Sequence, residues 1–489
     1  MKSFLHSVIS RSRLAGSRML AVAGLPVAIA TSSAAAAAAP APLPAPPVVT
    51  VLKSSHRVAR GLIFVAPKVT AANTVGTQGP EIIDDQGRPI WFQPVDADAQ
   101  ATDFRVQRYR DEPVLTYWLG TSHTGAGHGE GVDYVLDQSY RVIATVKAGG
   151  GLDADSHEFH LTPRNTALIT VYHAVPYDLS TVGGSANGQV FDGIVQELDV
   201  ATGRVLFEWH SLDHVGLDES QSPVPTSAST VYDYFHINAV NLDDDGNLII
   251  SARNTWAVYK LDHRTGDVIY RLSGKKSDFK VGPGASFAWQ HNPFADGWNT
   301  VRIFDNESNI GPSRVIWVRH DLRDHTATLV RAIEHPDQLS AGSQGNSQAL
   351  YNDDVFVGWG ATGRISEFDA NGNLLFDASV PTGYDTYRAY RFEWNGRPAS
   401  RPTATIARGE GSPTVHAIWN GATDVARWVV LGGGARGPLV PIATAAWNGL
   451  DTAIPVKNAP ARVEIVAFDA FGRLIGTSET TQPAIAVPT

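Results

Sequence analysis

The feature that most constrains the fold is a short unit of strand, tight polar turn and strand that recurs along the chain. We count six copies, each with Asp and usually Gly at its turn between β-branched and aromatic residues, which is the pattern of a β-hairpin. They lie at residues 81–94, 133–146, 195–209, 258–272, 315–333 and 365–378. No long amphipathic helical pattern occurs between them. The chain is therefore predicted to be all-β.

A second kind of hairpin precedes most copies of this unit. These leading hairpins lie at residues 104–118, 157–172, 236–253, 291–306, 346–360 and 387–397. Two hairpins make a four-stranded sheet, and six such sheets in series predict a six-bladed β-propeller. The hairpin at 387–397 has no second hairpin after it, so we expect it to join the hairpin at 81–94 and close the ring. A pair of sandwiches built from the same strands is the alternative, which the regular spacing disfavours.

The two ends of the chain differ from this repeat. Residues 1–38 resemble a signal peptide, with basic residues first, an apolar core from Met19 to Thr31 and small residues after it. The core is short for a membrane span, although an uncleaved N-terminal anchor is the alternative. Residues 39–57 predict a Pro/Ala-rich linker, 58–400 the propeller, 401–411 a second linker and 412–489 a small immunoglobulin-like β-sandwich. We expect a secreted, extracellular protein without a membrane span in the mature chain.

Composition excludes several functions. The chain of 489 residues carries a net charge of −10, which argues against nucleic acid as a partner because phosphates require a basic surface. It has no cysteine, so disulfides, thiolate metal sites and cysteine nucleophiles are excluded. There is no phosphate-binding or dinucleotide-binding glycine motif and no H-E-x-x-H zinc motif. We predict no cofactor and no metal, and the oligomeric state is left open.

Three of the sixteen histidines stand at equivalent places of the repeat. His157, His236 and His291 each begin a leading hairpin, and the leading strand of a propeller blade is its innermost one. Equivalent positions surround one axis, so these side chains are expected to meet at the mouth of the central channel. His160 lies close enough to His157 for the alignment of that blade to slip.

Hairpin geometry adds polar residues at the same end. The end of the second strand lies opposite the start of the first. Arg253 therefore lies beside His236, and Asp305 and Asn306 lie beside the start of the hairpin at 291–306. Asn238 follows His236 by two residues and points to the same side of the strand. The predicted site is a cluster of histidines with one arginine.

A metal is the competing interpretation, because three convergent histidines can bind zinc or copper. The arginine disfavours a second cation and suits an oxyanion such as sulfate or phosphate, which arginine binds through two parallel hydrogen bonds. The other histidines are expected in turns or solvent. His123 and His128 are placed in a flexible Gly-rich rim, and the solvated set is His173, His210, His214, His320, His325 and His335.

The segments that carry these residues resemble the arylsulfotransferase family, in its larger secreted branch. The resemblance rests on YDYFHINAVNLDDDGNLIISARNTW from residue 232, FAWQHNPF from 287 and VRIFDNES from 301, and it extends over about residues 58–400. One departure is the Asn-Pro pair after His291, where the proline removes a backbone donor.

The family resemblance implies ping-pong transfer of a sulfuryl group from an aryl sulfate to a phenolic acceptor, without the nucleotide sulfate donor PAPS. His291 would be the nucleophile and form a sulfohistidine. His236 and Arg253 would bind the sulfuryl oxygens and support the leaving phenolate, His157 would complete the cationic pocket, and Asn238 would assist. Asn306 is assigned with Asn238 to substrate binding.

Two other functions remain open on the sequence. One is a non-catalytic propeller that binds an anionic or aromatic ligand, and the other is a metal-dependent propeller lyase or hydrolase.

Overall fold

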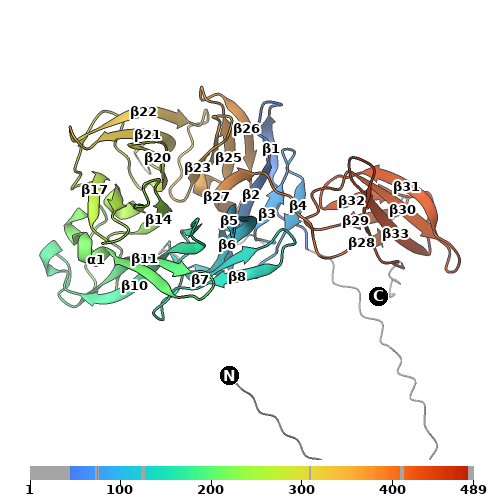
Figure 1. The fold of residues 1–489 in the computed structure, drawn as a ribbon, viewed down its shortest axis with the longest axis horizontal. Helices are drawn as coiled ribbons and strands as arrows, with labels where there is room; N and C mark the ends of the chain where they lie inside the picture. Colours follow the sequence, from blue (N-terminus) through green and yellow to red (C-terminus); the bar gives the residue numbers. More distant parts are fainter. Residues whose placement is uncertain are drawn as a thin grey trace, which may run out of the picture. The chain divides into compact units, whose positions relative to one another are not determined.

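The computed structural model describes residues 44–71, 74, 76–122, 127–307, 310–407 and 412–482. The predicted signal peptide lies outside these residues. In the described part of the chain, nearly all regular structure is β-strand, which confirms the all-β prediction (Figure 1). The helices are short: α1 (Ser211–His214) and the 3₁₀ turns η1 (Ser180–Val182), η2 (Leu217–Glu219), η3 (Arg253–Thr255) and η4 (Gly360–Thr362). No helix among the described residues is long and apolar enough to cross a bilayer.

Six antiparallel sheets follow one another along residues 50–392. The first three are β27-β2-β3-β4, β5-β6-β7-β8 and β9-β10-β11-β12. Their strands are β27 (Tyr384–Phe392), β2 (Leu62–Val69), β3 (Glu81–Ile83), β4 (Pro89–Phe92), β5 (Gln100–Tyr109), β6 (Glu112–Ser122), β7 (Gly129–Leu136), β8 (Val142–Val146), β9 (Phe159–Leu161), β10 (Thr166–Tyr177), β11 (Gly188–Asp199) and β12 (Val205–His210). A short β13 (Val231–Tyr232) pairs with β11 in parallel.

The other three sheets are β14-β15-β16-β17, β19-β20-β21-β22 and β23-β24-β25-β26. Their strands are β14 (Ile237–Leu242), β15 (Leu248–Ala252), β16 (Ala257–Leu261), β17 (Val268–Ser273), β19 (His291–Ala295), β20 (Thr300–Asp305), β21 (Arg314–Asp321), β22 (Thr326–Glu334), β23 (Asn346–Ala349), β24 (Val355–Gly358), β25 (Arg364–Phe368) and β26 (Leu374–Ser379). Two further strands extend their outer edges: β18 (Lys280–Val281) on β22 and β1 (Thr50–Ser54) on β26.

The repeated aspartate explains why the six hairpins form. In each copy, its carboxylate accepts a hydrogen bond from a backbone N–H two or three residues further on, which closes the turn. Thus Asp84 accepts from Gln86 at 2.9 Å and Asp137 accepts from Ser139 at 2.8 Å. The other four copies use Asp199, Asp262, Asp321 and Asp369 in the same way.

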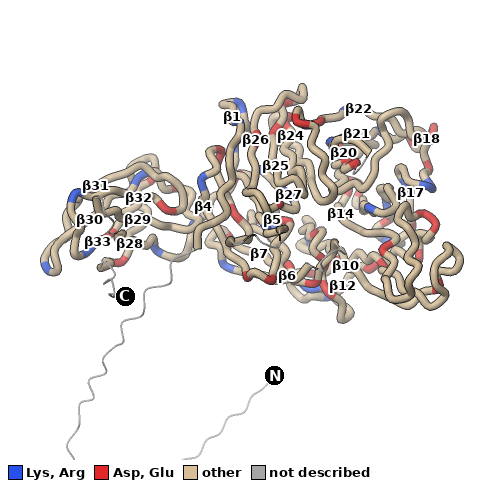
Figure 2. The backbone as a smooth tube through the Cα atoms, turned by 180° about the vertical axis from the view of Figure 1, so that it is seen from behind, with Lys and Arg blue, Asp and Glu red and all other residues tan. Residues whose placement is uncertain are grey.

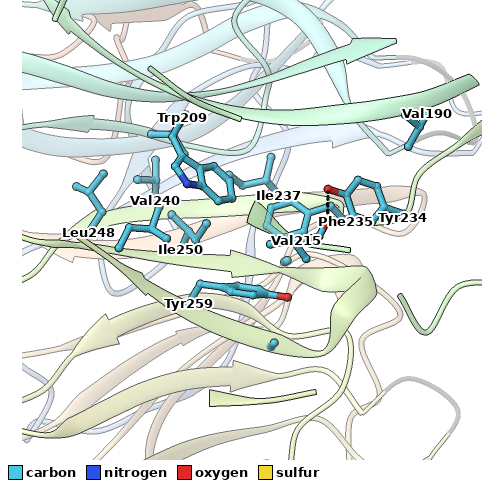
Figure 3. Close-up of a cluster of buried hydrophobic side chains, with 14 of the residues drawn as sticks. Val190, Trp209, Val215, Tyr234, Phe235, Ile237, Val240, Leu248, Ile250 and Tyr259 are labelled. Carbon is cyan, nitrogen blue, oxygen red and sulfur yellow. Dashed lines mark hydrogen bonds between the residues drawn. The ribbon is translucent and has the colours of Figure 1, made fainter. Parts of the chain in front are cut away.

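Apolar clusters join each sheet to the next. Between the third and fourth sheets, Trp209, Phe235, Ile237 and Tyr259 are buried together, and the Tyr234 hydroxyl donates to a backbone carbonyl at 3.2 Å (Figure 3). Similar clusters lie between the first and second, second and third, fourth and fifth, and fifth and sixth sheets. A sixth cluster joins the last sheet to the first. The packing of the described sheets therefore runs in a cycle, although no single sheet closes on itself.

The first sheet differs from its prediction. Only one strand, β27, comes from the expected hairpin at 387–397, and it pairs with β2 rather than with the hairpin at 81–94. Residues 393–397 form no strand. Pro67 in β2 sits where the pairing register shifts, so the missing proline N–H leaves the ladder otherwise intact.

Both predicted linkers contain a strand. Thr50–Ser54 pairs with β26, and β28 (Thr403–Ala407) pairs with β29 (Thr414–Ile418). The C-terminal strands form two sheets, β28-β29-β32 and β31-β30-β33-β34, over a shared apolar core. The remaining strands are β30 (Arg427–Gly433), β31 (Val440–Ala446), β32 (Asp451–Pro455), β33 (Arg462–Phe468) and β34 (Leu474–Thr477). Figure 2 shows acidic and basic residues interspersed along the chain, whereas strands β28, β29, β31 and β34 carry neither.

Candidate functional site

The structure brings the three predicted histidines together. His157 lies two residues before β9, His236 directly precedes β14 and His291 begins β19. The ring centroids of His157 and His236 are 5.2 Å apart. The ring of Tyr387, from β27, lies 5.6 Å from His157 and 6.4 Å from His291. We refer to His157, His236 and His291 as the histidine cluster; all three are buried.

Arg253 lies beside the cluster as hairpin geometry predicts. Its backbone N–H donates to the carbonyl of His236 at 2.9 Å, which pairs the end of one strand with the start of the other. Its Nη2 donates to the carbonyl of Gly342 at 3.3 Å. Burial lowers the pKa of Arg253, which remains a cation at neutral pH.

In two histidines of the cluster, a carboxylate lies within hydrogen-bonding distance of Nδ1. His157 Nδ1 is 2.5 Å from Asp155 Oδ2, and His236 Nδ1 hydrogen-bonds Asp233 Oδ2. Burial would raise the pKa of Asp155, but the His157 ring and the Gly129 N–H hold it below its usual value. Asp155 is therefore ionised, so it accepts the hydrogen bond from Nδ1–H of His157.

His291 has an amide where the other two have a carboxylate. Its Nδ1 is 2.8 Å from Asn306 Oδ1, and its Nε2 accepts a hydrogen bond from the backbone N–H of Gln344 at 3.2 Å. An Nε2 that accepts carries no proton, which assigns the ring proton to Nδ1. Burial, and then the positive charge of Arg253, hold the pKa of His291 well below its usual value. His291 is thus a neutral imidazole whose lone pair is on Nε2.

The two amides predicted to bind substrate, Asn306 and Asn238, both bond to the backbone near the cluster. Asn306 Nδ2 donates to the carbonyls of Ala341 at 3.1 Å and Gln344 at 2.9 Å. Asn238 Nδ2 donates to the carbonyl of Gln290 at 2.8 Å. Both side chains are fully buried. Their donor atoms bond to protein carbonyls and so hold neighbouring segments in place, while their assignment to substrate binding stays a prediction.

Other histidines take different places from those expected. His160 lies within β9 and lines a cavity of about 620 Å³ away from the cluster, so the repeat alignment at His157 is the one the structure adopts. His128 is buried and stacks on Tyr172 at 4.7 Å, which corrects its assignment to a flexible rim. His123 lies outside the described residues.

Two histidines assigned to solvent, His320 and His335, are buried. His335 also belongs to the one described group whose atoms are close enough to hold a metal, with Asp337 and Asp377. Arg364 binds both of these carboxylates. A guanidinium already supplies the positive charge there, which disfavours a cation.

Sequence reasoning missed the groups that orient the cluster. Asp155 and Asp233 precede their histidines by two and three residues, so a search for acidic residues close before each histidine could have found them. Tyr172, whose hydroxyl donates to the Ile237 carbonyl at 2.7 Å, and Tyr387 come from other strands. Gln344 acts through its backbone, for which the sequence gives no signal.

The site is therefore a group of imidazoles and one guanidinium in an all-β protein, in which burial holds the pKa of both His291 and His236 below the usual value while Arg253 remains a cation. Such a set suits the binding of an oxyanion next to a nitrogen nucleophile. Residues 105–380 match the family model described as Arylsulfotransferase (ASST), a segment that contains all six predicted site residues. This match covers more than half of the chain, and the chain belongs to the arylsulfotransferase family.

Comparisons with other proteins add little. No curated protein matches the sequence. A protein of unknown function from Bacteroides caccae shares 10% identity over 68% of this chain and 98% of its own, at a TM-score of 0.42. Virginiamycin B lyase from Staphylococcus aureus shares 9% identity over 75% of this chain and 94% of its own, at 0.29. Because both TM-scores are below 0.5, these likenesses carry no argument about function.

Proposed function

We propose that the chain transfers a sulfuryl group from an aryl sulfate to a phenolic acceptor through a sulfohistidine at His291, without PAPS. The observation that supports this most is the difference between the three rings. Asn306 can accept from Nδ1 of His291 but adds no charge, so the imidazole stays neutral and nucleophilic. Asp155 and Asp233 each face Nδ1 of a ring, so a carboxylate is in place to stabilise positive charge that develops on His157 or His236 during transfer.

In the first half-reaction, the Nε2 lone pair of His291 attacks the sulfur of the donor. A nitrogen–sulfur bond forms, the bond from sulfur to the aryl oxygen breaks, and the phenolate takes a proton from His157 or His236. Arg253 faces the charge on the sulfuryl oxygens. Sulfuryl transfer resembles phosphoryl transfer in that positioning and electrostatic stabilisation supply most of the catalysis.

In the second half-reaction, the acceptor phenol attacks the same sulfur. The nitrogen–sulfur bond breaks and returns the lone pair to Nε2, and the acceptor proton passes to the histidine that gave one before. The cycle leaves the enzyme unchanged and requires no further reactant.

The N–H of Gln344 occupies the lone pair that attacks, so donor binding has to displace it. Once displaced, this N–H lies next to the sulfuryl group and can donate to one of its oxygens. The segment from Ala341 to Gly345 must therefore shift when a donor enters.

The test is transfer from 4-nitrophenyl sulfate to phenol, followed as nitrophenolate release, in the wild type and in His291→Ala. We expect acceptor-dependent release that the variant loses, and a mass increase of one SO₃ group on the peptide that carries His291 when acceptor is omitted. His173→Ala, at an exposed histidine of β10, is the matched control and should behave as the wild type.

No release from the wild type with a range of phenols would refute the proposal and favour a ligand-binding protein. Release that a chelator abolishes would favour a metal-dependent enzyme instead.

We also propose that the six cyclically packed sheets are the blades of a six-bladed propeller followed by an immunoglobulin-like sandwich, and that the protein is exported. The cycle of apolar clusters supports the propeller, and the composition of residues 1–38 supports export.

A further inference from the structure

Arg253 is held differently from the fully buried arginines of the described chain. Each of those forms an ion pair with a carboxylate: Arg105, Arg302, Arg388 and Arg391. Arg253 forms no ion pair with any described carboxylate, and the charge of Asp233, which raises its pKa, acts on it without direct contact. Its guanidinium carbon lies 4.6 Å from the ring centroid of Trp289, and its N–H groups bond to Asn254 Oδ1 and the Gly342 carbonyl.

The backbone at Trp289 is strained. Its φ is 57°, in the left-handed region that glycine and asparagine adopt with least strain. Trp256, whose ring contacts that of Trp289 edge to face at 5.2 Å, has a φ of 54°. A bulky side chain in this conformation costs free energy, so an aromatic ring at position 289 calls for a compensating role.

Placement indicates what that role is. Trp289 precedes His291 by two residues, and Trp256 follows Arg253 by three, so the ring pair links the segment of the nucleophile to the segment of the arginine. An aromatic face attracts a cation without adding negative charge. A carboxylate in the same place would hold the guanidinium equally well, but it would neutralise it and repel an anionic sulfate.

We propose that Trp289 is a positioning residue that holds Arg253 as an unneutralised cation for the sulfuryl group. This rests on the proposed function. Trp289 contributes to the reaction only through Arg253, so its effect depends on the presence of that arginine.

The test is a double-mutant cycle on kcat/KM for 4-nitrophenyl sulfate, with Trp289→Leu, Arg253→Leu and the pair. We expect Trp289→Leu to lower kcat/KM about tenfold in the wild type, in line with a partly desolvated cation–π contact. In the Arg253→Leu background the same change should cost less than about twofold. Equal effects in both backgrounds would overturn the proposal.

A second readout separates positioning from a structural role. Because Arg253 stabilises charge that develops on transfer, Trp289→Leu should lower the rate with phenyl sulfate, a poorer leaving group, more than with 4-nitrophenyl sulfate. Trp289→Phe, which keeps an aromatic face, should restore most of the activity. Equal losses with both donors, or no rescue by phenylalanine, would count against the proposal.

Two variants serve as controls for misfolding. Trp289→Gly relieves the left-handed backbone, so we expect it to fold and still to lose activity. Trp298→Leu changes a tryptophan that is 97% exposed on the β19–β20 turn and should match the wild type. An inactive wild type refutes the proposed function and this inference together, whereas an active wild type with an active Trp289→Gly refutes this inference alone.

Discussion

The first prediction concerns Asn306, whose amide oxygen lies next to Nδ1 of the proposed nucleophile His291. Asn306→Asp places a carboxylate 2.8 Å from Nδ1 of His291 without changing the size of the side chain. The new negative charge stabilises the imidazolium, so it opposes the burial and the Arg253 charge that hold the pKa of His291 down. His291 will then be protonated, and unable to attack, over more of the acid range.

The size of this effect follows from the contact. An opposite charge within a few ångströms favours the charged form by about 1 to 3 pH units. We therefore expect the acid limb of kcat/KM, where activity falls as His291 gains a proton, to move to higher pH by that amount. An ionised aspartate also cannot donate to the carbonyls of Ala341 and Gln344, and each lost buried hydrogen bond costs about 1–3 kcal/mol.

The assay measures kcat/KM for 4-nitrophenyl sulfate from acid to alkaline pH, with alkaline quenching so that nitrophenolate is read at one pH. Asn306→Ala is the matched control, because it loses the same two hydrogen bonds without adding charge. We expect both variants to lose plateau activity and only Asn306→Asp to move the acid limb upward. An acid limb that does not move in Asn306→Asp, or moves down, refutes the assignment of His291 as the neutral nucleophile.

Asp155→Asn should lower kcat/KM about 10²-fold, the usual size of a lost acid–base contribution, because Nδ1–H of His157 loses its carboxylate acceptor. Asp153→Asn, at an exposed site nearby, serves as the control, and equal activity of the two variants would contradict this role. Val49→Ala, beside β1, should lower the free energy of unfolding by about 1.6 kcal/mol, from two buried carbons at ~0.8 kcal/mol each. Unchanged denaturant midpoints would show that β1 does not hold this residue in the core.

The repeat could be read from the sequence because each hairpin carries its own turn chemistry. Asp84, Asp137 and their four equivalents bind the backbone of their own turns, so the signal is local. β2 was missed because Pro67 interrupts an apolar run without alternation, and Thr50–Ser54 was missed because the surrounding prolines and alanines resemble a linker. Pairing partners more than 300 residues away decided both strands.

The sequence also predicts only part of the site. The phase of the repeat predicted that His157, His236 and His291 converge, because equivalent positions occupy equivalent places. It could not predict which atoms hydrogen-bond each ring, since Asp155 precedes its histidine by two residues whereas Asn306 follows the second strand of the hairpin that its histidine begins. The left-handed backbone of Trp289 is likewise set by its neighbours and not by its own propensity.

The pairing of β27 with β2 affects when the first sheet can fold during synthesis of the chain. One sheet contains both Leu62–Val69 and Tyr384–Phe392, so it cannot form until nearly 400 residues have been synthesised. Contacts this distant in sequence form slowly, because the loop between them must close first. Tyr387, whose ring lies against those of His157 and His291, belongs to β27. A chain that ends before residue 384 would therefore keep all three histidines and still lack the ring of Tyr387 that lies against two of them.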